Sequence, residues 1–308
     1  HRDLHYPLRR QRQMCIRDRN GDDSEIDHSR ACRPFGDNAG LILGEAAQFV
    51  LVASLEKAFE LGLEIYALAP GIKINADGIK KSISSPGIGN YITMASAVNE
   101  TKQFSNDLKR SFVIAHGTGT FQNRSTESHV LSSVANGMGL NEWEITGLKG
   151  SLGHTMGPAA GDELMTAIGF WKHGFIPGIN TTKKLAEDVC KDSLNFILED
   201  TEKDKESIDA IYLNAKGFGG NNASAGIISP KIAFDLANQE FSKAEHLQYE
   251  QNKEKVRESS INYQESCKKG DYGVIYRFNE EVLEGLEDIE ISEEGIKLKG
   301  FKAPIKFN

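Results

Sequence analysis

Hydrophobic and polar positions form short blocks along the chain, and these blocks predict a mixture of strands and helices. Residues 111–115 (SFVIA) are a continuous apolar run, which is typical of a short buried strand. Residues 159–173 repeat apolar side chains at helical spacing. The pattern predicts strands at 41–54, 64–74, 111–115, 144–148, 210–214 and 223–228, and helices at 55–62, 95–104, 127–139 and 159–173. This order indicates an α/β fold.

The last 78 residues have a different pattern. Residues 232–267 are highly charged, carry little apolar surface and are expected to be mostly helical. Two short strands are expected at 272–278 and 289–301, and the alternation in the second breaks at Glu294-Gly295, which signals a hairpin. We therefore predict a helical and β-hairpin extension over residues 231–308.

Composition narrows the class of protein. The 308 residues are 39% hydrophobic and 26% charged, which is ordinary for a soluble globular chain. No apolar run approaches the roughly 18 residues of a membrane span. The net charge of −8 argues against a nucleic-acid-binding protein, because binding to phosphates needs a basic surface. The four cysteines, without CxxC or CxxH pairs, predict neither a disulfide framework nor a metal site, and they favour a cytoplasmic protein.

Arginine is concentrated at the amino terminus. Six of the 12 arginines lie in the first 19 residues, which contain none of the 24 lysines. Within this segment, residues 14–18 (MCIRD) match the translation of the DNA string ATGTGTATAAGAGACAG, which resembles the transposase mosaic end used to prepare sequencing libraries. We therefore interpret residues 1–19 as translated adapter and read-through rather than as a basic arm or a targeting peptide. Without them the net charge is 30 − 42 = −12.

These patterns predict three parts. Residues 1–30 form a non-native or disordered leader, residues 31–230 form the main α/β part, and residues 231–308 form the charged extension.

Three segments of the main part carry candidate chemistry. The first, residues 116–120 (HGTGT), directly follows the buried strand at 111–115. The second, residues 149–154 (KGSLGH), leads into the helix at 159–173, and the third, residues 217–222 (GFGGNN), lies between two apolar strands. Taken singly, a histidine at a strand end is more often structural, and a glycine-rich turn is most simply a hairpin. None of the three has the spacing of a dinucleotide-binding loop.

In this order and spacing, the three segments resemble the C-terminal half of the β-ketoacyl-ACP synthases, condensing enzymes with a thiolase-like fold. Residues 31–35 (ACRPF) and the following Gly40, Gly44 and 45–47 (EAA) resemble the start of that half. The resemblance covers about residues 31–229. It implies a layered α-β-α arrangement, and it implies decarboxylative Claisen condensation of malonyl-ACP with an acyl thioester in fatty acid or polyketide synthesis.

The resemblance also implies residue roles. His116 and His154 would donate hydrogen bonds from neutral imidazoles to the developing negative charge of the malonyl thioester. Lys149 would organise the charge of the pocket, with Glu163 as its acidic partner. Thr118 and Thr120 would bind the phosphopantetheine arm, and Phe218 would gate the acyl pocket, with its backbone N–H in the oxyanion hole. The structural alternatives are a surface ion pair for Lys149 and Glu163, and plain packing between the strands for Phe218.

No cofactor of the protein itself is expected, because phosphopantetheine arrives on the acyl carrier protein. The resemblance implies that the partner is an acyl carrier protein with malonyl and acyl thioesters. It also implies a homodimer for the full-length synthase, here called the parent, of which this chain would be a part.

Several positions depart from the pattern of the family. Asn123 is followed by Arg124 where an acidic residue is common, although Glu127 is retained. Pro158 and Ala160 alter a glycine-alanine turn, and Lys216 replaces an aromatic residue before the glycine-rich turn. These departures leave open the acyl chain length and whether the parent initiates or elongates chains.

A nucleophilic cysteine is not identified. Cys15 lies in the adapter-like segment, Cys32 begins the family-like half, Cys190 follows a charged helix and Cys267 lies in the extension. We therefore expect a truncated reading frame that forms no acyl-enzyme by itself, and an exposed face where the other half would pack.

Two other functions remain possible from the sequence alone. One is a catalytically silent, synthase-like partner that sets chain length, which would not need to keep His116, Lys149 and His154 together. The other is a thiolase-like acyltransferase that uses coenzyme A.

Overall fold

The computed structural model describes residues 31–37, 40–78, 87–273, 285–300 and 303–307. Contacts within the chain divide it into two compact units, residues 1–250 and 251–308. The leader predicted at residues 1–30, with its adapter-like segment, lies outside the described residues.

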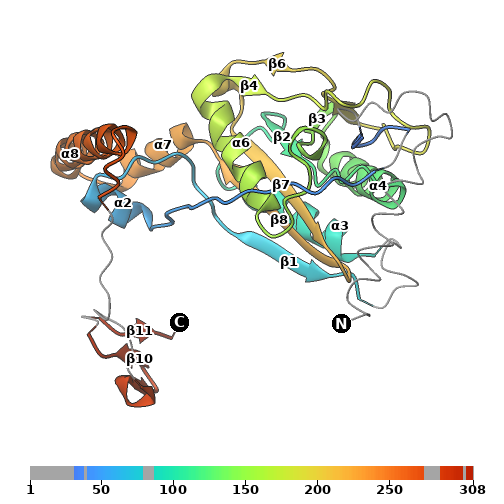
Figure 1. Cartoon of the computed structure of the whole chain (residues 1–308). Coiled ribbons are helices and arrows are strands. Elements are labelled where there is room, and N and C mark those ends of the chain that lie inside the picture. The colour runs from blue at the N-terminus through green and yellow to red at the C-terminus, as the bar shows by residue number, and fades with distance from the viewer. Residues whose placement is uncertain (1–30, 38–39, 79–86, 274–284, 301–302, 308) are drawn as a thin grey trace. The chain divides into compact units, whose positions relative to one another are not determined.

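The first unit is built on a six-stranded mixed sheet with the order β1-β8-β7-β2-β3-β5 (Figure 1). Strand β2 pairs in parallel with β7 and with β3, and β3 pairs in parallel with β5. Strand β8 is antiparallel to both β7 and β1. The strands are β1 (Ile72–Ala76), β2 (Ser111–Ile114), β3 (Trp143–Thr146), β5 (Leu194–Phe196), β7 (Ala210–Gly217) and β8 (Asn221–Ile228).

Helices cover both faces of this sheet, because the central strands are apolar on both sides. On β2, Phe112 packs in one core cluster with Phe170 of α6 (Ala159–His173). The next residue, Val113, packs in the other cluster with α3 (Gly89–Thr101) and α4 (Phe121–Met138). The predicted layered α-β-α fold is thereby confirmed.

The predicted strand at 111–115 and the predicted helix at 159–173 are confirmed almost to the residue. The hairpin of β7 and β8 is also confirmed, with each strand longer than expected. Helix α4 starts at Phe121, six residues before its predicted start. Its first turns carry mainly polar side chains, so they show no apolar repeat that could reveal a helix.

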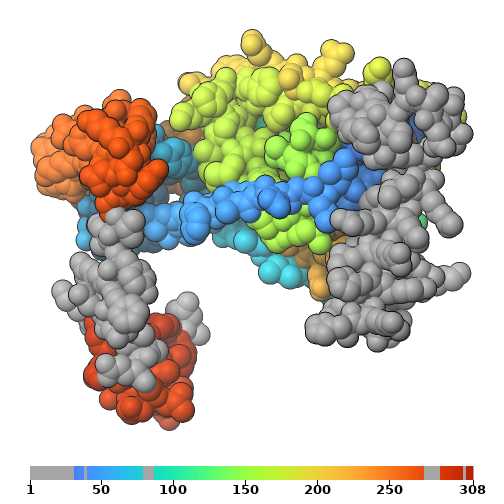
Figure 2. Space-filling model, viewed as in Figure 1, coloured from blue at the N-terminus to red at the C-terminus, as the bar shows by residue number. Residues whose placement is uncertain are grey.

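The strand predicted at 41–54 is wrong. Within the described residues this segment forms only an isolated bridge between Leu43 and His154 and otherwise has no regular structure. It crosses the surface as an extended strip (Figure 2), and Phe49 is 97% exposed. Its apolar side chains suggest a buried strand, but a strand also needs a neighbour to pair its backbone groups. The helix that follows is confirmed as α2 (Leu55–Leu61).

The strand predicted at 64–74 is wrong over most of its length, because β1 begins only at Ile72. Before it, Leu68 makes an isolated antiparallel bridge with Ile228. Residues 69–71 (APG) interrupt the pairing, and Pro70 has no backbone N–H to donate.

The charged helical stretch is two helices, α7 (Pro230–Glu240) and α8 (Lys243–Lys268). Helix α7 and the first turns of α8 pack on α2, where the rings of Phe59 and Tyr249 stack with centroids 4.3 Å apart. The tyrosine hydroxyl donates to the carbonyl of Leu63 at 3.1 Å. This packing places the division between the units after Glu250, 20 residues beyond the predicted end of the main part.

In the second unit, a small sheet has the order β11-β10-β9. Its strands are β9 (Ile289–Ser292), β10 (Gly295–Leu298) and β11 (Ile305–Lys306), preceded by a short 3-10 helix, Leu286–Asp288. The hairpin predicted at Glu294-Gly295 is confirmed as the β9–β10 turn. Most of the strand predicted at 272–278 lies outside the described residues. Within the described ranges, none of the helices is long and apolar enough to span a bilayer.

Candidate active site

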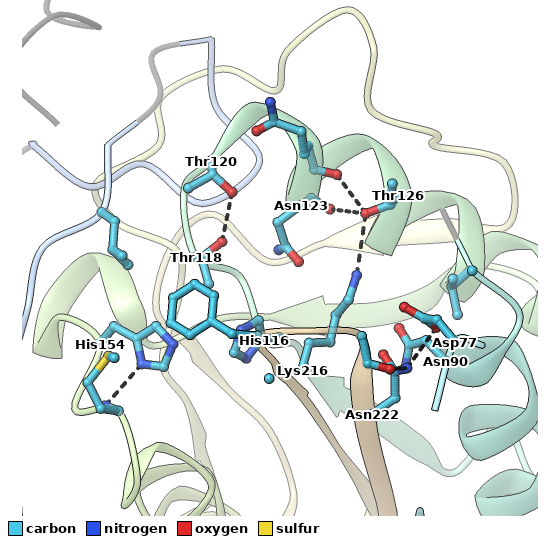
Figure 3. A pocket seen from close by; sticks show the side chains of 18 of the residues that line it. Asp77, Asn90, His116, Thr118, Thr120, Asn123, Thr126, His154, Lys216 and Asn222 are labelled. Atoms are coloured by element: carbon cyan, nitrogen blue, oxygen red, sulfur yellow. Dashed lines mark hydrogen bonds between the residues drawn. The ribbon is translucent and has the colours of Figure 1, made fainter. Parts of the chain in front are cut away.

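The three segments singled out in the sequence meet at one edge of the sheet. Strands β2, β3 and β7 are parallel, so the residues that follow them emerge at the same edge, where open α/β sheets commonly bind ligands. His116 follows β2, helix α5 (Lys149–Leu152) follows β3, and Phe218 follows β7. A cavity of about 410 Å³ opens there, and its lining includes His116, Thr118, Thr120, His154, Lys216 and Phe218 (Figure 3).

The two histidines face each other in this cavity. Their ring centroids lie 5.2 Å apart with the planes at 83°, so one ring points its edge at the other. Burial, together with the charges of Lys149 and the neighbouring groups, holds the pKa of His116 well below 6.5. Burial and the Lys149 charge lower the pKa of His154 to about 4. Both imidazoles are therefore neutral at pH 7 and can act as hydrogen-bond donors without carrying charge.

The tautomer of His154 follows from its contact with the backbone. The N–H of Met156 donates to His154 Nδ1 at 3.1 Å. Because a neutral imidazole carries one proton and Nδ1 accepts here, the proton sits on Nε2. The donor of His154 is thus Nε2–H.

Lys149 is buried and does not line the cavity, but its charge acts on both histidines. Its Nζ donates to Glu163 Oε1 at 2.9 Å, and the two side chains are only 3% and 1% exposed. Burial raises the pKa of Glu163 to about 7, against the opposing effect of the lysine charge. The alternative of a surface ion pair is thereby excluded, and the lysine charge adds to the burial that lowers the pKa of both histidines.

A buried carboxylate that the sequence did not single out as a site residue fixes the turn at His116. Glu127 on α4 accepts hydrogen bonds from the backbone N–H groups of His116 and Gly117, at 2.7 and 2.9 Å. The side-chain amides of Asn123 and Asn214 also donate to it, both at 2.7 Å. Glu127 is fully buried. The sequence shows that the glutamate of the family is retained at position 127. The helix was predicted to start only at this residue, however, so the polar residues before it were not assigned to the same helix and the network around Glu127 could not be predicted.

The segment containing residues 42–44 holds the loop of His154. The His154 N–H donates to the carbonyl of Ile42 at 2.7 Å, and the Gly44 N–H donates to the His154 carbonyl at 3.0 Å. The backbones approach so closely that a Cβ on Gly44 would lie 2.2 Å from the carbonyl oxygen of Leu152. Gly153, before the histidine, has φ +73°, which favours glycine.

The substrate-binding residues expected from the resemblance line the same cavity. The hydroxyls of Thr118 and Thr120 lie 3.1 Å apart, and Phe218 is 63% exposed at the tip of the β7–β8 turn. Plain packing of Phe218 between the strands does not match this exposure.

The departures at positions 124 and 216 have different surroundings. Arg124 pairs with Asp188 at 2.7 Å and donates to the carbonyls of Gly36 and Asp37, so it fixes the 33–37 turn to α4. Lys216 instead lines the cavity, and its Nζ donates to Thr126 Oγ1 at 3.3 Å.

Cysteines do not line the cavity within the described residues. Cys32 is buried and its Sγ lies 3.7 Å from the carbonyl oxygen of Thr118, and Cys190 and Cys267 are partly buried elsewhere. Cys15 lies outside the described residues. Among the described residues, groups of three or more metal-ligating side chains are not found.

Comparison with known proteins agrees with this geometry. The family described as "Beta-ketoacyl synthase, C-terminal domain" matches residues 66–183. That stretch contains both histidines, Lys149 and Glu163. Residues 66–183 form a β-ketoacyl synthase C-terminal domain. The family predicted from the motifs is confirmed.

Relatives of this synthase domain extend the likeness over most of the chain. The β-ketoacyl-[acyl-carrier-protein] synthase FabY of Pseudomonas aeruginosa is 39% identical over 92% of this chain and 45% of its own. The crystal structure of that noncanonical ketosynthase superposes with a TM-score of 0.81 at 38% identity, with the same coverage. The ishigamide ketosynthase/chain length factor superposes with a TM-score of 0.55 at 26% identity, over 64% of this chain and 47% of its own. The chain thus spans less than half the length of each relative.

A match over 92% of the chain must include most of residues 231–308. The charged extension is therefore shared with FabY of P. aeruginosa and is not peculiar to this synthase-like chain.

Proposed function

We propose that the chain provides the malonyl-donor site of a β-ketoacyl-ACP synthase, which performs decarboxylative Claisen condensation in fatty acid or polyketide synthesis. The observation that carries this proposal is that the imidazoles of His116 and His154 lie 5.2 Å apart in the lining of one cavity. The buried Lys149–Glu163 pair, whose lysine charge lowers the pKa of both histidines, supports it. The relatives named ketosynthases support the same reaction class.

The proposed reaction begins when the malonyl thioester loses its carboxylate as CO₂. The electron pair of the broken C–C bond moves toward the thioester carbonyl and produces an enolate. The N–H groups of His116 and His154 hydrogen-bond to that oxygen as its charge develops, which is where fixed donors lower a barrier most. The enolate carbon then attacks the acyl thioester, and the thiolate of that thioester leaves.

Lys149 acts through the histidines. A protonated imidazole would be costly in this buried cavity beside a lysine charge, so both rings stay neutral donors. Glu163 holds the ammonium in place and compensates for its burial.

We propose that the thioester arrives on the phosphopantetheine arm of an acyl carrier protein. The adjacent hydroxyls of Thr118 and Thr120 are placed to bind the amides of such an arm, and Phe218 stands exposed at the turn where an acyl chain would pass. One related ketosynthase is known in complex with its acyl-carrier protein.

We propose that the acyl group is carried by a cysteine other than the three found among the described residues. The cavity is not lined by Cys32, Cys190 or Cys267, and Cys32 is closely packed against the 118–119 backbone. We accordingly propose that the chain by itself forms no acyl-enzyme.

Intact mass spectrometry tests the acyl-enzyme part of the proposal. The chain is incubated with acetyl-ACP or a longer acyl-ACP and then weighed. We expect no stable acyl adduct, and an adduct on Cys32, Cys190 or Cys267 would contradict this part.

A parallel incubation with malonyl-ACP and with malonyl-CoA tests the donor and the carrier. Conversion of malonyl-ACP to acetyl-ACP, faster than conversion of the coenzyme A thioester, is expected. A preference for the coenzyme A thioester would favour the thiolase-like alternative. Failure to convert either donor would favour the silent partner.

A further inference from the structure

A carboxylate outside the cavity contacts the turn that carries His154. Asp162 lies in the first turn of α6. Its Oδ2 accepts a hydrogen bond from Thr155 Oγ1 at 2.6 Å, and its Oδ1 accepts one from Gln48 Nε2. Thr155 directly follows the histidine and is buried. The carboxylate thus ties the residue after His154 to the extended segment 41–54.

The contact with Gln48 depends on a close fit at the start of α6. A Cβ on Gly161 would lie 2.6 Å from Gln48 Oε1, so the glycine makes room for the side-chain amide. Nearer the beginning of the same segment, the Gly44 N–H donates to the His154 carbonyl at 3.0 Å. The segment therefore holds the turn of His154 at two points, once through the backbone and once through Asp162.

The turn after His154 has a backbone conformation that needs such support. Met156 has φ +66°, in the left-handed region that favours glycine. Its N–H donates to His154 Nδ1 at 3.1 Å, so the proton of the neutral ring sits on Nε2 (Figure 3). A conformation of this kind persists only where the surrounding contacts hold it. Thr155, which lies between these two residues, is held by Asp162.

We propose that Asp162 is a positioning residue for His154: by holding Thr155, it keeps the Met156 N–H on the imidazole and the donor proton on Nε2. This inference deepens the proposed function and rests on it. Neither Asp162 nor Thr155 lines the cavity. Both residues therefore act through the histidine and not on the substrate.

Loss of this contact should lower kcat and leave KM unchanged. The hydrogen bond from His154 to the enolate oxygen strengthens as negative charge develops, so a misplaced ring loses stabilisation in the transition state. The cavity lining that binds the malonyl donor is not substituted. We expect kcat for decarboxylation to fall about tenfold, which corresponds to one hydrogen bond.

Two variants of the full chain test the contact. Thr155→Val removes the hydroxyl, keeps nearly the same shape and changes no charge. Asp162→Ala removes the carboxylate together with its charge, which contributes to raising the pKa of Glu163. Histidine NMR at pH 7 reads the tautomer of His154, and the decarboxylation of malonyl-ACP gives kcat and KM. The wild type should carry the proton on Nε2 alone, whereas both variants should show a mixture of the two tautomers and the lower kcat.

Two further variants separate positioning from a general loosening of α6. Thr155→Ser keeps the hydroxyl and should show the wild-type tautomer and kcat. Thr166→Val is the matched control, because Thr166 Oγ1 donates to the backbone carbonyl of Asp162 at 2.9 Å and not to its carboxylate. The control should change neither reading. Circular dichroism of each variant reports folding, and if Asp162→Ala does not fold, the comparison of Thr155→Val with Thr155→Ser decides by itself.

The outcomes separate this inference from the proposed function. A wild-type tautomer and kcat in Thr155→Val, or equal changes in Thr166→Val, would overturn the role of Asp162 and leave the malonyl-donor site standing. A wild type that releases no acetyl-ACP would overturn the proposed function instead. The NMR comparison would then still decide whether Asp162 positions His154, because it needs no substrate.

Discussion

Lys149 Nζ lies 2.9 Å from Glu163 Oε1, and neither side chain is more than 3% exposed. Burial is the main reason that the pKa of both histidines is low, and the charge of Lys149 lowers it further. Such a pair adds little net stability by itself, but breaking it leaves a buried charge without compensation. Substitution of either residue should therefore affect both the stability of the fold and the electrostatics of the site.

Glu163→Gln should lower the free energy of unfolding by about 3–5 kcal/mol, because the ammonium of Lys149 loses its counter-charge. Urea denaturation at pH 8.5, where Glu163 with its pKa of about 7 is ionised, measures the change. The exposed pair Lys57–Glu60, with side chains 52% and 65% exposed, is the control. Lys57→Met should change stability by less than about 1 kcal/mol. An equally small effect of Glu163→Gln would contradict the account of this pair.

Lys149→Met should make stability depend on pH near neutrality. The pKa of Glu163 is already raised to about 7 by burial, and removal of the lysine raises it further. A carboxyl whose pKa is raised on folding contributes stability at low pH that is lost as the pH rises through the folded value. Denaturation midpoints of this variant should fall as the pH rises from 6 to 8 more steeply than those of the wild type. The same dependence of the denaturation midpoint on pH in the variant and the wild type would contradict this prediction.

His154 should remain neutral well below the ordinary histidine range, because its pKa is lowered to about 4. Histidine NMR should show one neutral tautomer, protonated at Nε2, from about pH 8 to about pH 5. The unfolded chain binds this proton near pH 6.5, so His154 disfavours folding increasingly as the pH falls from 6.5 toward 4. A titration midpoint near 6.5 would contradict the lowering of the pKa by burial and Lys149. A proton on Nδ1 would disprove the hydrogen bond from the Met156 N–H.

Gly44→Ala should displace the loop of His154, because the added Cβ would meet the Leu152 carbonyl oxygen at 2.2 Å. We expect a loss of stability and a changed His154 NMR signal. Gly137→Ala is the matched control, because a Cβ there meets nothing within 4 Å and the position is inside helix α4. The control should stabilise the chain by up to about 1 kcal/mol. An unchanged His154 signal in Gly44→Ala would rule out the role of this contact.

Local patterns in the sequence predicted the helices and strands in which buried side chains recur at a regular spacing. The apolar run at 111–115 and the helical repeat at 159–173 could be predicted because each is decided by its own residues. The segment 41–54 could not, since its state depends on whether another strand pairs with it. The exposed Phe49 looks the same in sequence as a buried one.

The residues of the site and the Lys149–Glu163 pair could be predicted from the motifs, but the contacts of Glu127 could not. The ordered segments containing His116, Lys149 and His154 carried enough information to place them together. Glu127, which joins α4 to the His116 turn and to Asn214, acts over long sequence separations. Neither spacing nor hydrophobic pattern contains such contacts.

The central claim is that His116 and His154 stabilise the enolate formed when a malonyl thioester loses CO₂. Decarboxylation of malonyl-ACP by the chain, followed as formation of acetyl-ACP, measures this step without any acyl-enzyme. We predict that the wild type converts malonyl-ACP above the uncatalysed rate and that His116→Ala and His154→Ala each lose about 100-fold or more, the usual effect of removing one oxyanion donor. Lys57→Met, on an exposed residue that does not line the cavity, should keep the wild-type rate. A wild-type chain that releases no acetyl-ACP, or a rate that survives either histidine substitution, would contradict the account.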